Sequence, residues 1–198
     1  MLLPNQLTIA RIVLTPVFMY LFLSDNPLMK QISLGVFIVA AITDWYDGWL
    51  ARKFNYITAW GKFLDPLADK ILTSSAFIAF VYLDVLELWM VIIIVFRDFL
   101  ITGLRAYAEY RNQYFSTSVL AKWKTFIQMV FIYYLLLVYV LGTVEYFENN
   151  YQELWVILKD QTMIYWSMFA ITLFTLVTGI MYLINNRLLI KKLAFVKD

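Results

Sequence analysis

Four aspartates within a stretch of 26 residues have the clearest capacity for chemistry in this chain. Asp44 and Asp47 are three residues apart, and Asp65 and Asp69 are four apart. On a helix, both spacings place the two carboxylates of a pair on one face, those of the first pair about 60° apart around the axis. Four carboxylates without a histidine or cysteine nearby form a set of hard oxygen ligands that suits Mg²⁺, Mn²⁺ or Ca²⁺ rather than zinc. The spacing therefore predicts a divalent-cation site.

The composition limits which protein could carry such a site. The chain has 198 residues, of which 63% are apolar, 19% aromatic and 15% charged, and its mean hydropathy is +0.72. Soluble domains carry about 25% charged residues, so lipid must solvate part of this surface. The absence of cysteine and histidine excludes a thiol nucleophile, a disulfide scaffold and an imidazole base. Acid–base chemistry here must use carboxylates, with lysine and arginine as partners.

A second interpretation of the aspartates is that they are interfacial helix-end charges paired with neighbouring basic residues: Arg52, Lys53, Lys62 and Lys70. Mutual repulsion among four carboxylates favours the metal site, because a divalent ion offsets it better than a flexible lysine does. Gly48 lets a ligand approach the backbone closely, and Arg52, one turn further, could reach a phosphate from the same face. Gly61 opens similar space or is a plain loop-to-helix glycine.

Six apolar stretches are close to the length of about 17–25 residues that spans a bilayer. They cover approximately residues 8–23, 32–50, 63–83, 86–107, 126–141 and 163–184. The connections between them are too short for a soluble domain, so residues 1–198 are expected to form one membrane domain. The first span is expected to be retained and not cleaved as a secretory signal, because no positive region precedes it and no cleavage pattern follows it. Residues 1–6 are expected to be a short amphipathic segment at the membrane interface.

The basic residues of the connections indicate the orientation, since lysine and arginine concentrate on the cytoplasmic side. With a cytoplasmic N-terminus, the outer connections hold only Lys30 and Lys159. The inner connections and the tail hold most of the others: Arg52, Lys53, Lys62, Arg105, Arg111, Lys122, Lys124, Arg187, Lys191, Lys192 and Lys197. We therefore expect an all-α integral membrane protein of the cell membrane with six transmembrane helices and both termini cytoplasmic. The four aspartates would face the cytoplasm.

Residues 44–69 read DWYDGWLARKFNYITAWGKFLDPLAD. This resembles the signature of the CDP-alcohol phosphotransferase family at all eight of its defined positions: Asp44, Asp47, Gly48, Ala51, Arg52, Gly61, Asp65 and Asp69. Three further segments, residues 4–11, 97–105 and 122–125, are similar to the phosphatidylglycerophosphate synthases within that family. Asp98 departs from the pattern, because glutamate is expected there more often.

The resemblance implies roles for the signature residues. Asp44, Asp47 and Asp65 would hold two divalent ions, Mg²⁺ or Mn²⁺, with Asp69 as a further ligand and as the general base. The headgroup of CDP-diacylglycerol would be bound by Asn5, Thr8, Gly48, Arg52, Thr58 and Gly61. The acceptor hydroxyl of sn-glycerol 3-phosphate would attack the lipid-side phosphorus and release CMP. The family usually forms homodimers, and no nucleic-acid partner is implied.

An acceptor that carries a phosphate needs cations besides the metal ions. Arg97 and Arg105 are eight residues apart on one predicted helix, near one face, and Lys122 and Lys124 lie across the same connection. We expect some of these residues to bind glycerol phosphate. The alternative is that they serve topology and attract anionic lipid, at about 1 kcal/mol per residue, and this is the interpretation we favour for Arg111.

Other functions share part of this pattern. A membrane-type cardiolipin synthase or an inositol-phosphate phospholipid synthase would carry the same signature with another acceptor. Intramembrane prenyltransferases also bind pyrophosphate through metal-bound aspartates, but the stretch from Gly61 to Asp69 fits them poorly. A transporter or cation channel would spread its carboxylates across the membrane depth, whereas these four lie at one face.

Overall fold

A computed structural model describes the backbone of residues 3–54, 59–111, 113, 115, 119–144, 146–147 and 151–195. Within these ranges, the side chains of residues 3–6, 44–45, 47–52, 54, 59–65 and 192–195 lie outside the description. The described elements, all helices, are α1 (Leu3–Phe22), α2 (Pro27–Phe54), α3 (Ala59–Tyr82), α4 (Leu88–Tyr110), α5 (Val119–Leu141), α7 (Gln152–Leu158), α8 (Gln161–Asn185) and α9 (Arg187–Phe195).

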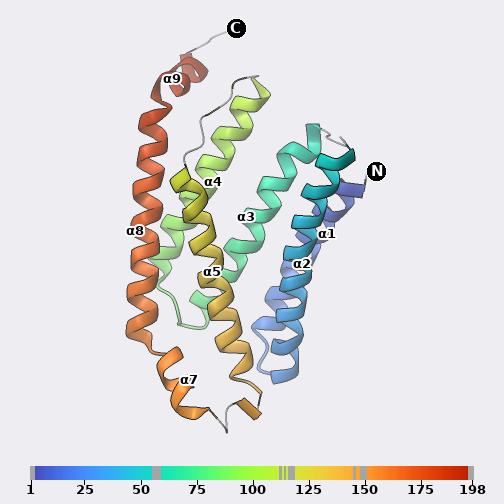
Figure 1. The fold of residues 1–198 in the computed structure, drawn as a ribbon, viewed down its shortest axis with the longest axis vertical. Coiled ribbons are helices and arrows are strands. Elements are labelled where there is room, and N and C mark those ends of the chain that lie inside the picture. The colour runs from blue at the N-terminus through green and yellow to red at the C-terminus, as the bar shows by residue number, and fades with distance from the viewer. Residues whose placement is uncertain are drawn as a thin grey trace.

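The long helices run side by side along the longest axis of the molecule (Figure 1). The short helix α7 lies at one end of the bundle, and α9 lies at the other end. Helix α1 packs against α2 and α3, α3 packs against α4, and α8 packs against α4 and α5. This arrangement brings the first halves of α3 and α5 to the same end of the bundle as the second halves of α4 and α8.

The all-α class expected from the sequence is confirmed. Each of the six predicted spans falls on one long helix and extends at most two residues beyond it. Val119–Leu141 and Gln152–Asn185 are long and apolar enough to cross a membrane, and Leu7–Phe22 and Pro27–Thr43 are shorter apolar stretches. The number of six membrane crossings stays a prediction.

Helix ends in the described chain follow from local side-chain chemistry. Before α2, Asn26 Oδ1 accepts a hydrogen bond from the backbone N–H of Leu28 at 2.9 Å, and Pro27 occupies the first helical position, where no N–H is needed. Before α8, Asp160 Oδ1 accepts a hydrogen bond from the N–H of Met163 at 2.9 Å. In the turn after α3, Asp84 has φ 55°, a conformation that aspartate tolerates better than most residues.

An aromatic cluster joins helices α1, α2, α3 and α5. The rings of Phe18 and Phe37 are 5.0 Å apart, those of Phe22 and Phe80 are 5.2 Å apart, and those of Phe80 and Tyr139 are 5.6 Å apart. These separations fall within the favourable range for aromatic pairs. Because Phe80 is fully buried and contacts rings from two other helices, it fixes the position of α3 in the bundle.

Several buried hydroxyl groups donate hydrogen bonds within their own helices. Thr15 donates to the carbonyl of Arg11 at 2.9 Å, Ser75 donates to that of Leu72 at 2.7 Å, and Thr172 donates to that of Met168 at 2.8 Å. Such bonds allow small polar residues between helices without leaving a hydroxyl unpaired in an apolar surrounding. Close helix packing therefore does not require an entirely apolar interior.

Replacing Phe80 with alanine should lower the free energy of unfolding by about 3 kcal/mol, because it removes two aromatic contacts and leaves a cavity. The measurement is thermal unfolding in detergent. Phe96→Ala is the matched control, since the Phe96 side chain on α4 is 66% exposed. Equal losses in the two variants would contradict the central role of Phe80.

Candidate active site

A cavity of about 320 Å³ lies between α3, α4, α5 and α8. Helix α3 contributes Pro66, Asp69 and Lys70, and α8 contributes Tyr182. The remaining lining comes from α4 and α5: Arg97, Asp98, Ile101, Thr102, Arg105, Ala106, Glu109, Ala121 and Thr125. The predicted general base thus borders the same space as both predicted phosphate-binding arginines.

Asp98 lies at the centre of the charged groups around this cavity. Its side chain is 3% exposed. Its Oδ1 accepts hydrogen bonds from Arg97 Nη1 at 3.1 Å and from Lys124 Nζ, while Lys70 Nζ is 3.9 Å from Oδ2. Three cationic groups therefore surround this carboxylate, and one of them, Lys70, also pairs with Asp69.

Lys70 connects this cluster to the predicted base. Its Nζ lies 3.2 Å from Asp69 Oδ2 in addition to its approach to Asp98. The Asp69 side chain is 23% exposed, so the carboxylate borders the cavity and stays accessible to a ligand. Pro66, one turn earlier, has no backbone N–H to compete for a nearby acceptor.

Helix α8 contacts the two arginines from the opposite side. Arg97 Nη2 donates a hydrogen bond to Thr178 Oγ1 at 3.3 Å. Arg105 Nε donates to the hydroxyl of Tyr182 at 3.4 Å, and the guanidinium carbon lies 5.6 Å from the centre of that ring. Arginine lies favourably over an aromatic face at this distance. Both guanidinium groups are thus held by α8.

The four basic residues predicted to bind the acceptor phosphate occupy different surroundings. Arg97 and Arg105 line the cavity. Lys124 is 1% exposed and pairs with Asp98, and it does not belong to the cavity lining. Lys122 is exposed and is not part of the lining either.

Lys70 lines the cavity, although the sequence indicated it only as a partner for the aspartates. Its position directly after Asp69 was the available signal. Neighbouring residues on a helix point about 100° apart, so Asp69 can border the cavity while Lys70 also reaches Asp98 on α4. Tyr182 and Thr178 gave no signal, since their role depends on how α8 packs against α4.

Several predicted site residues lie outside the described side chains: Asn5, Asp44, Asp47, Gly48, Arg52, Thr58, Gly61 and Asp65. Among the described side chains, no group of three or more acidic residues could hold a metal ion. Asp44 and Asp47 fall on α2, and Asp65 and Asp69 fall on α3, the next helix. Asp69 offers an accessible carboxylate, so the donor chemistry that the structure describes fits a hard divalent cation. Thr8, predicted to bind the headgroup, is fully buried.

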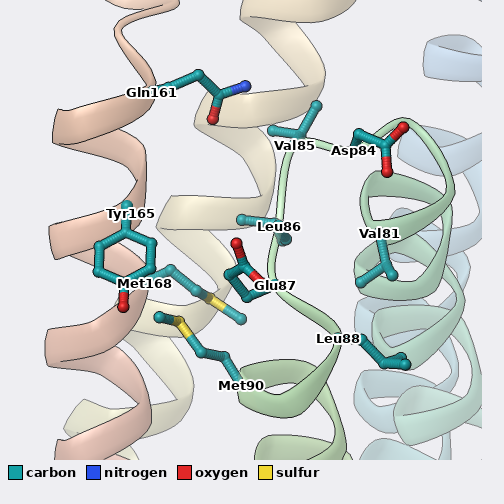
Figure 2. Close-up of a pocket in the computed structure, with 10 residues that line it drawn as sticks. All are labelled: Val81, Asp84, Val85, Leu86, Glu87, Leu88, Met90, Gln161, Tyr165 and Met168. Carbon is teal, nitrogen blue, oxygen red and sulfur yellow. The ribbon is translucent and has the colours of Figure 1, made fainter.

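A second cavity, of about 430 Å³, lies at the opposite end of α3, α4 and α8. Figure 2 shows Asp84 and Glu87 on the α3–α4 turn, with Gln161 on the facing helix. Among the residues that the structure describes, its lining holds these two carboxylates and no lysine or arginine. An anionic substrate would be repelled there, so the cavity beside Asp69 is the candidate active site.

The model of the CDP-alcohol phosphatidyltransferase family matches residues 1–195. The chain therefore belongs to this family of membrane-embedded transferases, and the resemblance drawn from residues 44–69 is confirmed.

Individual relatives share much of the sequence. A Bacillus subtilis (strain 168) protein called CDP-diacylglycerol–glycerol-3-phosphate 3-phosphatidyltransferase is 42% identical over 147 residues, which cover 68% of this chain and 76% of the relative. A Rickettsia typhi protein of the same name is 42% identical over 127 residues, which cover 64% of this chain and 71% of the relative. A similarly named protein of Wigglesworthia glossinidia brevipalpis is 40% identical over 139 residues, with 67% and 75% coverage.

Replacing Asp98 with asparagine should lower the free energy of unfolding by about 3 kcal/mol, because it removes the carboxylate that pairs with Arg97 and with the buried Lys124. Thermal unfolding in detergent measures this. The double variant Asp98→Asn/Lys124→Met should recover part of the loss, since it removes the most buried of the three cations. Glu153→Gln, at an exposed position, is the control and should leave the unfolding temperature unchanged. Wild-type stability in Asp98→Asn would contradict the role of this cluster.

Proposed function

We propose that this chain transfers the phosphatidyl group from CDP-diacylglycerol to sn-glycerol 3-phosphate, giving phosphatidylglycerol phosphate and CMP. The observation that carries the proposal is that Asp69 borders the same cavity as Arg97 and Arg105. A base and two phosphate-binding groups in one space are what an acceptor with both a hydroxyl and a phosphate requires. The names of the relatives supply the lipid donor and the particular acceptor.

The reaction is an in-line displacement at the lipid-side phosphorus. The acceptor hydroxyl oxygen forms a bond to that phosphorus, the bridging P–O bond of the pyrophosphate breaks, and CMP leaves with the bonding electrons. Asp69 accepts the hydroxyl proton through its accessible carboxylate. Asp44, Asp47, Asp65 and Asp69 would hold two divalent ions, Mg²⁺ or Mn²⁺, which neutralise charge on the bridging and leaving oxygens when bound.

The acceptor phosphate binds between α3 and α4 in this proposal. Arg97 and Arg105 stand two helical turns apart on α4, about 12 Å along the axis, and both border the cavity. Guanidinium groups suit this role because each can donate two parallel hydrogen bonds to one phosphate. Lys70 adds a third cation from α3. Lys124 acts behind them as a counter-ion of Asp98 and does not contact the phosphate, and Lys122 remains a surface residue.

The proposal also assigns the lipid-donor site, the orientation in the membrane and the assembly. The headgroup of CDP-diacylglycerol is bound in this proposal by residues of the first three helices and the α2–α3 connection: Asn5, Thr8, Gly48, Arg52, Thr58 and Gly61. The chain crosses the cell membrane six times with both termini cytoplasmic, and its active site faces the cytoplasm, where the water-soluble acceptor is found. This orientation rests on the distribution of lysine and arginine. A homodimer is the proposed assembly.

The test is CMP release by purified protein in detergent with CDP-diacylglycerol and Mg²⁺. Glycerol 3-phosphate should support turnover, and inositol phosphate, free inositol, serine and phosphatidylglycerol should not. Chelation of divalent cations should abolish release, and Asp69→Asn should lower kcat by about a hundredfold or more, as loss of a general base does. Preference for a different acceptor would keep the reaction class and overturn the assignment of glycerol 3-phosphate.

Substitution of the two cavity arginines tests the acceptor site separately. Arg97→Ala and Arg105→Ala should each raise the KM for glycerol 3-phosphate by about tenfold or more, since each removes charge-assisted hydrogen bonds to the phosphate. The KM for CDP-diacylglycerol should stay near the wild-type value. Arg111→Ala is the matched control, because Arg111 is exposed at the end of α4 and does not line the cavity. Unchanged acceptor kinetics in both cavity variants would remove them from the site.

A further inference from the structure

Three residues on one face of α8 contact the two arginines of the acceptor site. Thr178, Gly179 and Tyr182 lie within four positions of one another, so they occupy one helical turn and a shared face. Thr178 is 2% exposed and Tyr182 is 4% exposed. Helix α8 packs against α4, the helix that carries both arginines. None of the three residues belongs to the aspartate signature.

Gly179 allows Arg97 to approach the backbone of α8. A Cβ atom built at this glycine would lie 3.0 Å from Arg97 Cγ, 3.3 Å from its Nε and 3.7 Å from its Cδ. The first two distances are crowded and the third is an ordinary contact. A Cβ atom at position 179 would therefore force the Arg97 side chain, or the backbone of α8, to shift by a few tenths of an ångström.

Hydrogen bonds then fix the orientation of the Arg97 guanidinium. Nη1 donates to Asp98 on one side and Nη2 donates to Thr178 on the other. The Thr178 hydroxyl keeps its own acceptor, the carbonyl of Phe174 at 2.9 Å. Arg97 Nε is buried and has no partner among the residues that the structure describes, so this side chain holds donor capacity that protein groups in the described part leave unused.

Tyr182 holds Arg105 by two interactions. Its hydroxyl accepts a hydrogen bond from Nε, and its ring lies beneath the guanidinium carbon. The ring is itself fixed by Phe115, whose centroid is 5.6 Å away. With Nε engaged by Tyr182, binding of a phosphate would use the two terminal nitrogens of Arg105, which have the bidentate geometry that suits it.

We propose that Thr178, Gly179 and Tyr182 are positioning residues that fix Arg97 and Arg105 for the acceptor phosphate. Helix α8 thereby determines the preference for a phosphorylated acceptor through the two arginines. This inference rests on the proposed function, because it takes the two arginines as the acceptor-phosphate site. Pre-orientation matters because an ordered side chain has already lost the rotamer freedom that binding would otherwise remove.

The first experiment measures steady-state CMP release by Gly179→Ala with glycerol 3-phosphate varied at saturating CDP-diacylglycerol. The KM for glycerol 3-phosphate should rise about tenfold, the cost expected when a charged hydrogen-bonding group is misplaced. The inhibition constant of inorganic phosphate, a competitor for the same site, should rise in parallel. The KM for CDP-diacylglycerol and kcat at saturating acceptor should stay near wild type. Gly103→Ala is the matched control, because a Cβ there meets no atom within 4 Å.

Two conservative pairs separate positioning from folding. Thr178→Ser keeps a hydroxyl for Arg97 and should behave as wild type, whereas Thr178→Val should raise the acceptor KM severalfold. Tyr182→Phe keeps the ring and loses only the hydroxyl, and Tyr182→Leu loses both. The KM for glycerol 3-phosphate should therefore be lowest in the wild type, higher in Tyr182→Phe and highest in Tyr182→Leu. A purely structural role would lower the unfolding temperature without this ordered, acceptor-specific change.

The outcomes distinguish this inference from the proposed function. If wild-type protein turns over glycerol 3-phosphate and the variants at 178, 179 and 182 show unchanged acceptor KM, the role of α8 is wrong. An equal rise in the KM for CDP-diacylglycerol in these variants would also show that the role assigned to α8 is wrong. If wild-type protein shows no turnover with glycerol 3-phosphate, the proposed function fails. In that case, calorimetric titration with inorganic phosphate tests the role of α8 separately. Weaker phosphate binding by Gly179→Ala than by wild type is expected, and equal affinity would overturn the inference.

Discussion

The contact of Asp98 with three cations constrains the arrangement of the helices around the site. Lys70 comes from α3, Arg97 from α4 and Lys124 from α5. A carboxylate that is 3% exposed is stable only if these cations reach it, because an unpaired buried charge costs several kcal/mol. The three helices must therefore meet at this point. The contact that organises the helices also holds Arg97 beside the cavity that Asp69 borders.

Features that depend on local spacing could be predicted from the sequence. The signature residues stand at fixed spacings along residues 44–69, so Asp69 could be singled out, and the family of the chain identified, without coordinates. Arg97 and Arg105 were placed on one face by helical periodicity, and both line the cavity. The all-α class followed from apolar stretches of membrane-spanning length. In each case the information lies in the spacing of residues along a continuous stretch of sequence.

Features that depend on helix rotation and packing could not be predicted in this way. Lys122 and Lys124 looked equivalent in the sequence, yet one is exposed and the other is buried against Asp98, because only one of them faces α4. Lys70 was visible only as a neighbour of Asp69. Tyr182 is 77 positions from Arg105, and nothing in either local sequence indicates that a tyrosine hydroxyl meets that guanidinium. Such pairs are defined by tertiary packing alone.

The place of Thr178, Gly179 and Tyr182 near the end of α8 has a consequence for how the protein is made. A ribosome synthesises α2 and α3, with the aspartates, well before it reaches α8. A nascent chain that has inserted only its first helices therefore carries the residues proposed to bind metal and lipid donor, while both arginines still lack their contacts on α8. If the proposed roles hold, competence toward the acceptor is therefore acquired only once α8 has been synthesised and packed against α4.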